Sequence, residues 1–291
     1  LRLAGALWRF WYTQGHLSEG RWRLERLLEA AASSAPDAAT VRAKALYGAS
    51  VLANEQGDYR SVVTLAEEAL RLYRDLDDKR GVASTLNVLA LVARMQGDFA
   101  RATALHEESL VLARALDDRN GIARGLSNLG ILASDQGDYA LAATLYEEGL
   151  SLFRSLGDDY GYALALTNLA EALRYQEAHA RALALYRESL ALHRSAGNKL
   201  GIVECLEGVA ALARLHGQPE RAARLWGATE ALRTAVGAVL QPADRAEHAQ
   251  SVAALGSKLA PEVLSTAWAA GRAMTVEQAV AYACDVNIQD C

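Results

Sequence analysis

The sequence predicts an all-α protein in which one helix pair is repeated along the chain. Two observations carry this prediction, the composition and an internal repeat. Of the 291 residues, 59 are Ala and 46 are Leu, whereas only four are Pro. Ala and Leu are strong helix formers and Pro interrupts helices, so the composition favours helices. An all-β fold would need more β-branched and aromatic residues.

The charge balance and the cysteines restrict the classes of function. The formal net charge of −5 argues against an extended nucleic-acid footprint, so we expect no direct contact with nucleic acid. No stretch approaches the roughly 18 consecutive apolar residues of a membrane span. The three Cys lack the spacing of a metal site. We therefore expect a cytoplasmic protein with reduced thiols and with neither a metal nor a membrane segment.

The internal repeat has a period of 40 residues. Gln-Gly-Asp followed by an aromatic residue ends at Tyr59, Phe99 and Tyr139, and a degenerate copy ends at His179. A glycine column and a leucine column share this period: Gly81, Gly121, Gly161 and Gly201, and Leu46, Leu86, Leu126, Leu166 and Leu206. Three columns with one period predict a repeat architecture.

Each repeat is expected to fold as a helix, a tight turn and a second helix, with roughly 17 residues in each helix. In the repeat that contains Gly97, apolar residues before the turn recur at helical spacing: Leu86, Leu89, Ala90 and Ala93. The expected inward residues after the turn are Phe99, Ala102, Leu105, His106, Ser109, Leu110 and Leu112. Asp78, Asp118 and Asp158 are predicted to cap the first helices, and the glycine that follows each is predicted to permit close packing.

The ends of the chain depart from the repeat. Residues 1–45 form a divergent first repeat, and residues 46–236 hold five repeats of period 40. Within 237–291 we expect three capping helices, from Pro242 to about Leu259, from Pro261 to Gly271 and from Thr275 to Val286. Such helices would cover the apolar face of the last repeat, and Thr275 with Gln278 matches a capping box.

The repeat pattern resembles the tetratricopeptide repeat. The best-matching positions are Leu126, Leu129, Gly130, Ala133, Gly137, Tyr139, Ala142 and Tyr146. The resemblance implies a right-handed superhelical solenoid of about six helix pairs with C-terminal capping helices, formed by residues 1–291 as a single domain.

Both ends of the chain also resemble bacterial multidomain signal-transduction ATPases, including LuxR- and AfsR-type transcriptional regulators. The matching segments are 1–28, 221–248 and 265–283. The resemblance implies that an ATPase domain precedes these repeats, and the missing initial Met leads us to expect a piece of a longer protein. No phosphate-binding loop occurs in this chain, because Gly256-Ser257-Lys258 lacks the upstream Gly, so ATPase activity does not carry over.

The sequence gives little support to an enzyme. The six His are scattered, and no metalloprotease, nucleophile-elbow or dinucleotide-binding motif occurs. The acidic pairs Glu67-Glu68, Glu107-Glu108 and Glu147-Glu148 recur with the repeat, as expected of a solvated outer helix face. We therefore predict no catalytic residues, no cofactor and no enzymatic activity. An unrecognised catalytic site is the alternative.

The resemblance implies that the first helix of each repeat lines a concave binding groove. Amide side chains there offer a donor and an acceptor to a peptide backbone, and Arg offers a planar fork to a carboxylate or phosphate. By resemblance, Asn128 and Asn168 match the backbone-binding position of peptide clamps. The predicted groove residues are Asn54, Asn87, Arg94, Arg124, Asn128, Asn168, Arg174 and Arg214. The expected ligand is an acidic segment of a protein or peptide, a C-terminus, or an anionic small-molecule inducer. The alternative is that these side chains are ordinary solvated groups or pair internally with Glu171 or Glu207.

Aromatic residues are concentrated near the N-terminus. Trp8, Trp11, Tyr12 and Trp22, together with Phe10, surround their helices in every direction instead of forming one stripe. They either form an interface with a preceding segment or fill the core of the first repeat. The leading interpretation is a sensor module of a bacterial signalling regulator, in which a ligand favours one of two states. The alternatives are a stand-alone scaffold and a self-associating array.

Overall fold

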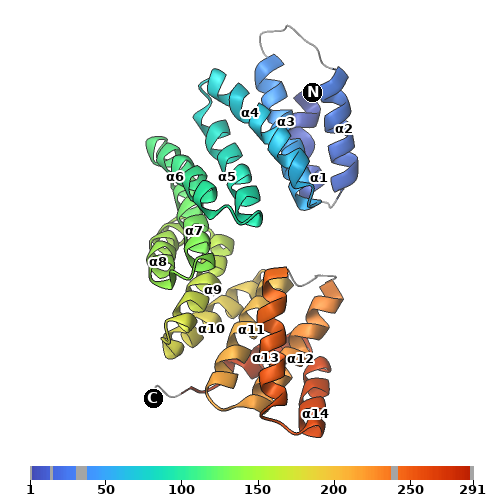
Figure 1. The fold of residues 1–291 in the computed structure, drawn as a ribbon, viewed down its shortest axis with the longest axis vertical. Coiled ribbons are helices and arrows are strands. Elements are labelled where there is room, and N and C mark those ends of the chain that lie inside the picture. Colours follow the sequence, from blue (N-terminus) through green and yellow to red (C-terminus); the bar gives the residue numbers. More distant parts are fainter. Residues whose placement is uncertain (1, 14–15, 31–37, 237–241, 289–291) are drawn as a thin grey trace. The chain divides into compact units, whose positions relative to one another are not determined.

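The computed structural model describes residues 2–13, 16–30, 38–236 and 242–288. Within these ranges the secondary structure consists of fifteen α-helices without a strand (Figure 1). The predicted all-α class is therefore confirmed. The contacts divide the chain into two compact units, 1–136 (unit 1) and 137–291 (unit 2), which are described separately.

Unit 1 is built from helical hairpins. Packing joins α1 with α2, α3 with α4 and α5 with α6, and each second helix also contacts the first helix of the next pair (Figure 1). The helices are α1 (Arg2–Thr13), α2 (Leu17–Ala30), α3 (Ala38–Glu55), α4 (Tyr59–Asp75), α5 (Lys79–Met95), α6 (Phe99–Ala115) and α7 (Arg119–Asp135). The predicted length of roughly 17 residues holds for α4 to α7, each of which has 17.

Unit 2 continues the helix pairs and ends in the three predicted terminal helices. Its helices are α8 (Tyr139–Leu156), α9 (Asp159–Tyr175), α10 (His179–Ser195), α11 (Lys199–Leu215), α12 (Pro219–Val236), α13 (Pro242–Gly256), α14 (Pro261–Arg272) and α15 (Val276–Cys284). Helix α14 packs along α12, and α15 contacts α10, α11 and α12. The capping box of Thr275 and Gln278 is confirmed. Residues 237–241 of the predicted capping segment lie outside the described ranges.

The recurring Gln-Gly-Asp sequence forms the turn between the two helices of a repeat. Gly57, Gly97 and Gly137 have φ values of 72°, 77° and 78°, in the left-handed region that glycine adopts without strain. The Asp that follows each glycine caps the next helix: the Asp98 side chain, for example, accepts a hydrogen bond from the Arg101 backbone N–H. In the degenerate repeat, Glu177 has a φ of 61° in place of glycine, and Ala178 provides no capping side chain.

The glycine column lies where successive helices come closest. A Cβ atom placed on Gly161 would lie 2.5 Å from the Phe153 ring, and one placed on Gly201 would lie 2.5 Å from the His193 ring. The preceding caps by Asp78, Asp118 and Asp158 are confirmed, since each accepts a hydrogen bond from its glycine N–H. Packing against a ring therefore requires glycine at Gly161 and Gly201.

Small residues and the leucine column build the core. Leu86, Leu89, Ala90 and Ala93 are all buried, as predicted. All five members of the leucine column are at most 1% exposed. Ala102 and Ser109 are buried on α6, where their small side chains allow α5 to approach. The high Ala content therefore reflects close helix pairing as well as helix propensity.

Candidate functional site

The first helices of the repeats in unit 1 carry rows of side chains that remain exposed or half-buried. We call these rows the A-helix face of unit 1. One row is polar, a second is mixed and a third is aliphatic, and each takes one residue from α3, α5 and α7. The rows are Lys44, Ser84 and Arg124; Tyr47, Asn87 and Ser127; and Val51, Leu91 and Ile131.

Tyr47 is the centre of the polar end of this face. Its ring meets the Trp8 ring edge-on, with the centroids 5.5 Å apart. Burial raises the pKa of Tyr47, while the nearby Arg9 and Arg124 guanidinium groups and a hydrogen bond with Ser84 act in the opposite direction. Side chains from α1, α3, α5 and α7 thus meet around one phenol group.

The cations at this end are not neutralised within the unit. Arg9, Lys44 and Arg124 are exposed, and among the described residues none of the three forms an ion pair with a carboxylate. Arg9 lies over the Trp8 ring at 5.4 Å, and Arg124 Nε donates to Asn120 Oδ1 at 2.7 Å. The guanidinium groups of Arg9 and Arg124 act on the Tyr47 phenol, and Lys44 is exposed one turn earlier on α3, so this end of the face carries positive charge that can accept an anionic group.

Arg94 has a different environment from Arg124, although the sequence assigned both to one groove. Its guanidinium holds the Asp135 carboxylate in a two-bond ion pair, with Nε at 2.5 Å and Nη2 at 3.1 Å. The pair links α5 to α7. Arg94 would have to leave Asp135 before it could bind an anionic ligand.

The predicted asparagines of unit 1 also differ from one another. Asn87 Oδ1 lies 2.8 Å from Nδ1 of His106, so this amide is held in place by the imidazole. His106 is buried, as predicted, and burial lowers its pKa to about 4, with a smaller contribution from Arg94. Asn128 is half-buried one turn after Arg124. Asn54 has a buried Oδ1 without a hydrogen-bond partner in the described structure.

The first helices of unit 2 have no cation at the positions equivalent to Lys44 and Arg124, where α9 has Leu164 and α11 has Glu204. Glu204 is exposed where unit 1 has Lys44 and Arg124, and Glu207 accepts two hydrogen bonds from Arg233. Asn168 on α9 is half-buried. An acidic ligand is therefore favoured by the A-helix face of unit 1 over its counterpart in unit 2.

The two predicted arginines of unit 2 are largely enclosed. The Arg174 side chain is 9% exposed, lies over the Tyr175 ring at 4.2 Å and pairs with Glu171 at 3.6 Å. This environment matches the internal pairing with Glu171 that the sequence left open. Arg214 is half-buried, and its Nε is buried without a hydrogen-bond partner in the described structure. Glu207, the other candidate partner, binds Arg233.

The N-terminal aromatic residues divide between core and surface. Trp11 is 7% exposed and packs against Gly20, where an added Cβ atom would lie 2.7 Å from the indole. Trp8 is half-buried against Tyr47. Tyr12 is 43% exposed and Trp22 is 56% exposed. Of these aromatic residues, Tyr12, Trp22 and Phe10 are exposed and could contact a further segment without rearrangement.

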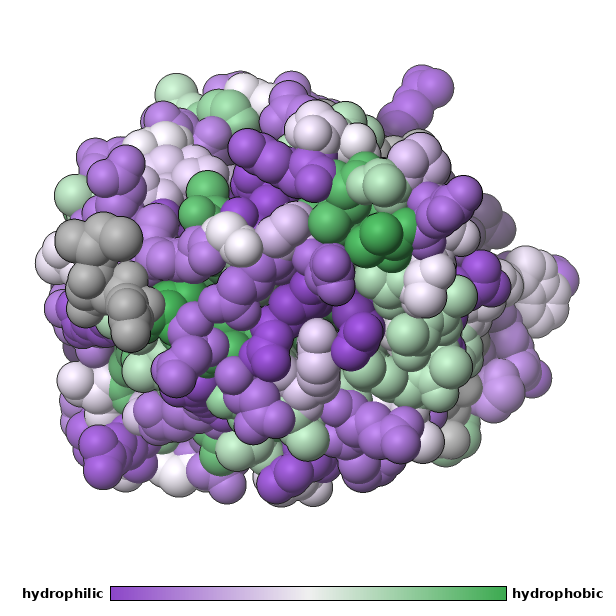
Figure 2. Space-filling view, turned by 90° about the horizontal axis from the view of Figure 1, so that it is seen from below, coloured by the Kyte–Doolittle hydropathy of each residue, from purple (hydrophilic) through white to green (hydrophobic). Residues whose placement is uncertain are grey.

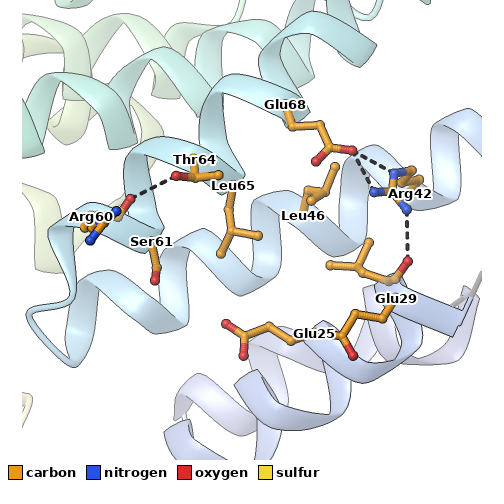
Figure 3. Close-up of a pocket in the computed structure, with 10 residues that line it drawn as sticks. Glu25, Glu29, Arg42, Leu46, Arg60, Ser61, Thr64, Leu65 and Glu68 are labelled. Carbon is orange, nitrogen blue, oxygen red and sulfur yellow. Dashed lines mark hydrogen bonds and ion pairs between the residues drawn. The ribbon is translucent and has the colours of Figure 1, made fainter.

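A cavity of about 390 Å³ lies between α2, α3 and α4 (Figure 3). Its apolar lining comes from Leu28, Leu46 and Leu65. Its charged lining includes Arg42, which is bound to Glu68 and to the Leu28 carbonyl oxygen. The sequence does not predict this cavity, because α2 belongs to the divergent first repeat and the 40-residue period does not place its residues.

The recurring acidic pairs lie on the second helices and link successive repeats. Glu67 pairs with Arg101, Glu108 with Arg74 and Glu147 with Arg181, each across 34 residues. These residues are exposed, as the predicted outer face requires. Exposed ion pairs of this kind contribute about 0–1 kcal/mol each, so their role in stability is small.

In the described ranges no helix combines the length and the apolar character of a membrane span. No group of three His, Cys, Asp or Glu side chains in the described ranges is arranged to hold a metal ion. Burial raises the pKa of the Cys205 thiol to about 11. Figure 2 shows that hydrophilic residues cover most of one face and that hydrophobic residues gather in small patches between them.

Comparisons with known proteins agree with this architecture. Residues 81–155 and 163–196 match models of the tetratricopeptide repeat. No curated protein matches the sequence significantly. Among solved structures, BtubC (BKLC) from P. vanneervenii is 17% identical with a TM-score of 0.58, over 78% of this chain and 92% of that chain.

Two peptide complexes are also similar in structure. A Rap protein complexed with competence and sporulation factor is 15% identical with a TM-score of 0.63, over 91% of this chain and 74% of that chain. The Rap conjugation gene regulator of plasmid pLS20 in complex with the Phr* peptide is 16% identical with a TM-score of 0.63, over 92% and 72%. At these identities the similarity shows the fold alone. Together with the repeat models, it establishes that this chain contains tetratricopeptide repeats.

Proposed function

We propose that the chain is a non-enzymatic sensor and interaction module that binds an acidic protein or peptide segment on the A-helix face of unit 1. The observation that carries this proposal is a set of three exposed cations without an ion pair among the described residues: Arg9 and Arg124, whose charges act on Tyr47, and Lys44, which lies one turn before Tyr47 on α3. The peptide complexes of the two similar Rap structures support a peptide as the ligand. An anionic small-molecule inducer would use the same cations.

Each row of the face has a role in this proposal. Ligand carboxylates bind at Lys44 on α3 and at Arg124 on α7, where each charge-assisted hydrogen bond contributes about 1.5–3 kcal/mol. An aliphatic ligand side chain lies on the row formed by Val51, Leu91 and Ile131. Asn128 provides an amide for the ligand backbone. Asn54, Asn87 and Arg94 flank this site. Asn87 and Arg94 already bind His106 and Asp135 within the unit, and the Oδ1 atom of Asn54 is buried.

The wider context is also a proposal. In it, residues 1–291 form one cytoplasmic solenoid that follows the ATPase domain of a bacterial signalling regulator. Tyr12 and Trp22 are exposed and would dock that domain. Ligand binding can change the activity of that regulator only if the ligand has a higher affinity for one of two conformational states of the protein than for the other. The second candidate is a stand-alone scaffold or self-associating array, in which Tyr12 and Trp22 contact a partner protein or another copy.

The test is selection of a random eight-residue peptide library on the immobilised protein. We expect acidic peptides to be enriched by the wild type, and the variant Lys44→Glu/Arg124→Glu to bind them at least tenfold more weakly, because two charge-assisted bonds are lost. The matched control is Arg71→Glu/Lys79→Glu, which changes the charge equally at exposed positions outside the face. Equal loss in both double variants, or no loss in either, would contradict the proposal.

A further inference from the structure

Beyond the proposed function, we propose that unit 2 contains a second peptide-binding site and that the chain's own segment 285–288 occupies it. The site is formed by Arg187 on α10, by Gln218, and by Arg221 and Arg224 on α12. We call these four side chains the arginine cradle. It surrounds the last turn of α15 and the residues that follow.

The cradle holds this segment through its backbone. Arg187 Nη2 donates to the carbonyl oxygens of Cys284 and Val286, at 2.7 Å and 2.5 Å. Gln218 Nε2 donates to the carbonyl oxygen of Asn287 at 2.6 Å. These contacts use main-chain oxygens, which every peptide has, so they do not depend on the identity of these residues.

One side chain anchors the segment. Val286 is 0% exposed, although it lies beyond the end of α15 and its neighbours Asp285 and Asn287 are exposed. The backbone of this segment continues the last turn of α15, since Asp285 has helical φ and ψ values and the Val286 N–H donates to the Ala283 carbonyl oxygen, and polar side chains hold its carbonyl oxygens while one aliphatic residue is buried. The segment therefore has the features of a ligand that is covalently attached to its own binding site.

The cradle retains donors that this segment does not use. Arg221 and Arg224 lie on the Tyr282 ring at 4.8 Å and 5.3 Å. One N–H group in each of Arg187, Arg221 and Arg224 is buried without a hydrogen-bond partner in the described structure. Because guanidinium donors prefer carboxylate acceptors, the favoured competing ligand is a short peptide with an aliphatic anchor and an adjacent acidic residue.

The attachment explains how the site is regulated. A tethered segment has an effective concentration in the millimolar range, so a free peptide of similar affinity cannot displace it at ordinary concentrations. The site becomes available when the segment is released or when a competing peptide supplies the carboxylate that the cradle lacks. In unit 2, the competing peptide thus displaces segment 285–288 from the arginine cradle.

The experiment uses protein of residues 1–291 and a fluorescent peptide of residues 283–288, with binding measured by anisotropy. In Val286→Asp, the buried charge releases the tethered segment, and we expect the peptide to bind. The wild type should bind it at least tenfold more weakly, because its site is occupied. Val263→Asp is the matched control, since this valine is 38% exposed on α14 and the tethered segment stays in place. It should behave as the wild type.

A third variant tests the cradle itself. Val286→Asp/Arg187→Ala should lose the binding that Val286→Asp gains, because the peptide carbonyls have lost their donor. If Val286→Asp does not fold, as judged by circular dichroism, Val286→Ala replaces it and should bind the peptide more tightly than the wild type. Folded Val286 variants that bind no peptide, or that bind it equally with and without Arg187, would overturn the proposal. Neither outcome bears on the A-helix face of unit 1.

Discussion

Gly81 on α5 lies directly against the ring of Tyr73 on α4, so closely that a Cβ atom on Gly81 would be 2.2 Å from Cδ1 of the ring. Tyr73 is buried, and Gly81 also donates its backbone N–H to the capping carboxylate of Asp78. One residue therefore meets two requirements at the junction of two repeats. The same ring contact recurs at Gly161 and Gly201, whereas at Gly121 an added Cβ atom would lie 2.8 Å from the capping carboxylate of Asp118.

Gly81→Ala should destabilise the protein although Ala favours helices. The added methyl group must displace a buried ring, and overpacking of this kind costs about 1–3 kcal/mol. The free energy of unfolding, measured by chemical denaturation, should fall by that amount. Gly256→Ala is the control, because a Cβ atom there meets no atom within 4 Å, and it should leave stability nearly unchanged. Equal effects at both positions would contradict the packing argument.

Ala178→Asp should stabilise the protein. Ala178 precedes α10 with φ −81° and ψ 57°, close to the −84° and 70° of Asp98, which caps α6. An aspartate at this position can accept a hydrogen bond from the first turn of α10, which contributes about 0.5–2 kcal/mol. Thermal unfolding should shift upward. The control, Ala191→Asp at an exposed position within α10, should shift it slightly downward. An unchanged or lowered midpoint for Ala178→Asp would show that the degenerate turn cannot be capped.

Glu177→Gly should also stabilise the protein, in addition to the gain from Ala178→Asp. Glu177 has a φ of 61°, in the left-handed region where the other repeats have glycine, and a non-glycine residue is strained there. Removing this strain is expected to stabilise the folded state by about 1 kcal/mol, partly offset by the larger entropy of the unfolded chain. The expected readout is a higher denaturation midpoint. Glu220→Gly, an exposed change in the first turn of α12, should lower it instead.

His106 should make stability depend on pH. Its pKa in the folded state is about 4, against 6.5 for an unperturbed histidine, so the unfolded chain binds a proton that the folded protein excludes. Stability is complete above pH 6.5 and falls as the pH drops toward 4. Between pH 7.5 and pH 5 the loss from this group is about 2 kcal/mol.

His106→Gln should remove most of that dependence. Burial also lowers the pKa of His193, which contributes in the same direction and leaves a residual slope in the variant. The free energy of unfolding of both proteins at pH 7.5 and pH 5 provides the comparison. If both lose stability equally over this range, His106 is protonated in the folded state and the assignment is wrong.

The period of 40 residues allowed much of the fold to be predicted. It located the paired helices, the turn glycines and the caps because these depend on local backbone requirements repeated in each unit. It could not assign the roles of the arginines. Arg94 and Arg174 occupy equivalent positions, yet one pairs with Asp135 across 41 residues and the other is covered by Tyr175. These differences depend on which neighbours are acidic or aromatic, and the period says nothing about them.

The central claim is that a peptide lies across the first helices of unit 1. The most direct measurement is photocrosslinking of a selected acidic peptide to protein carrying a benzoylphenylalanine at a chosen position. Placed at Leu91, in the middle of the aliphatic row, the photoreactive group should crosslink to the peptide. Placed at Val111, which is 63% exposed on the second helix α6, it should not. Crosslinking at Val111 without crosslinking at Leu91 would contradict the claim.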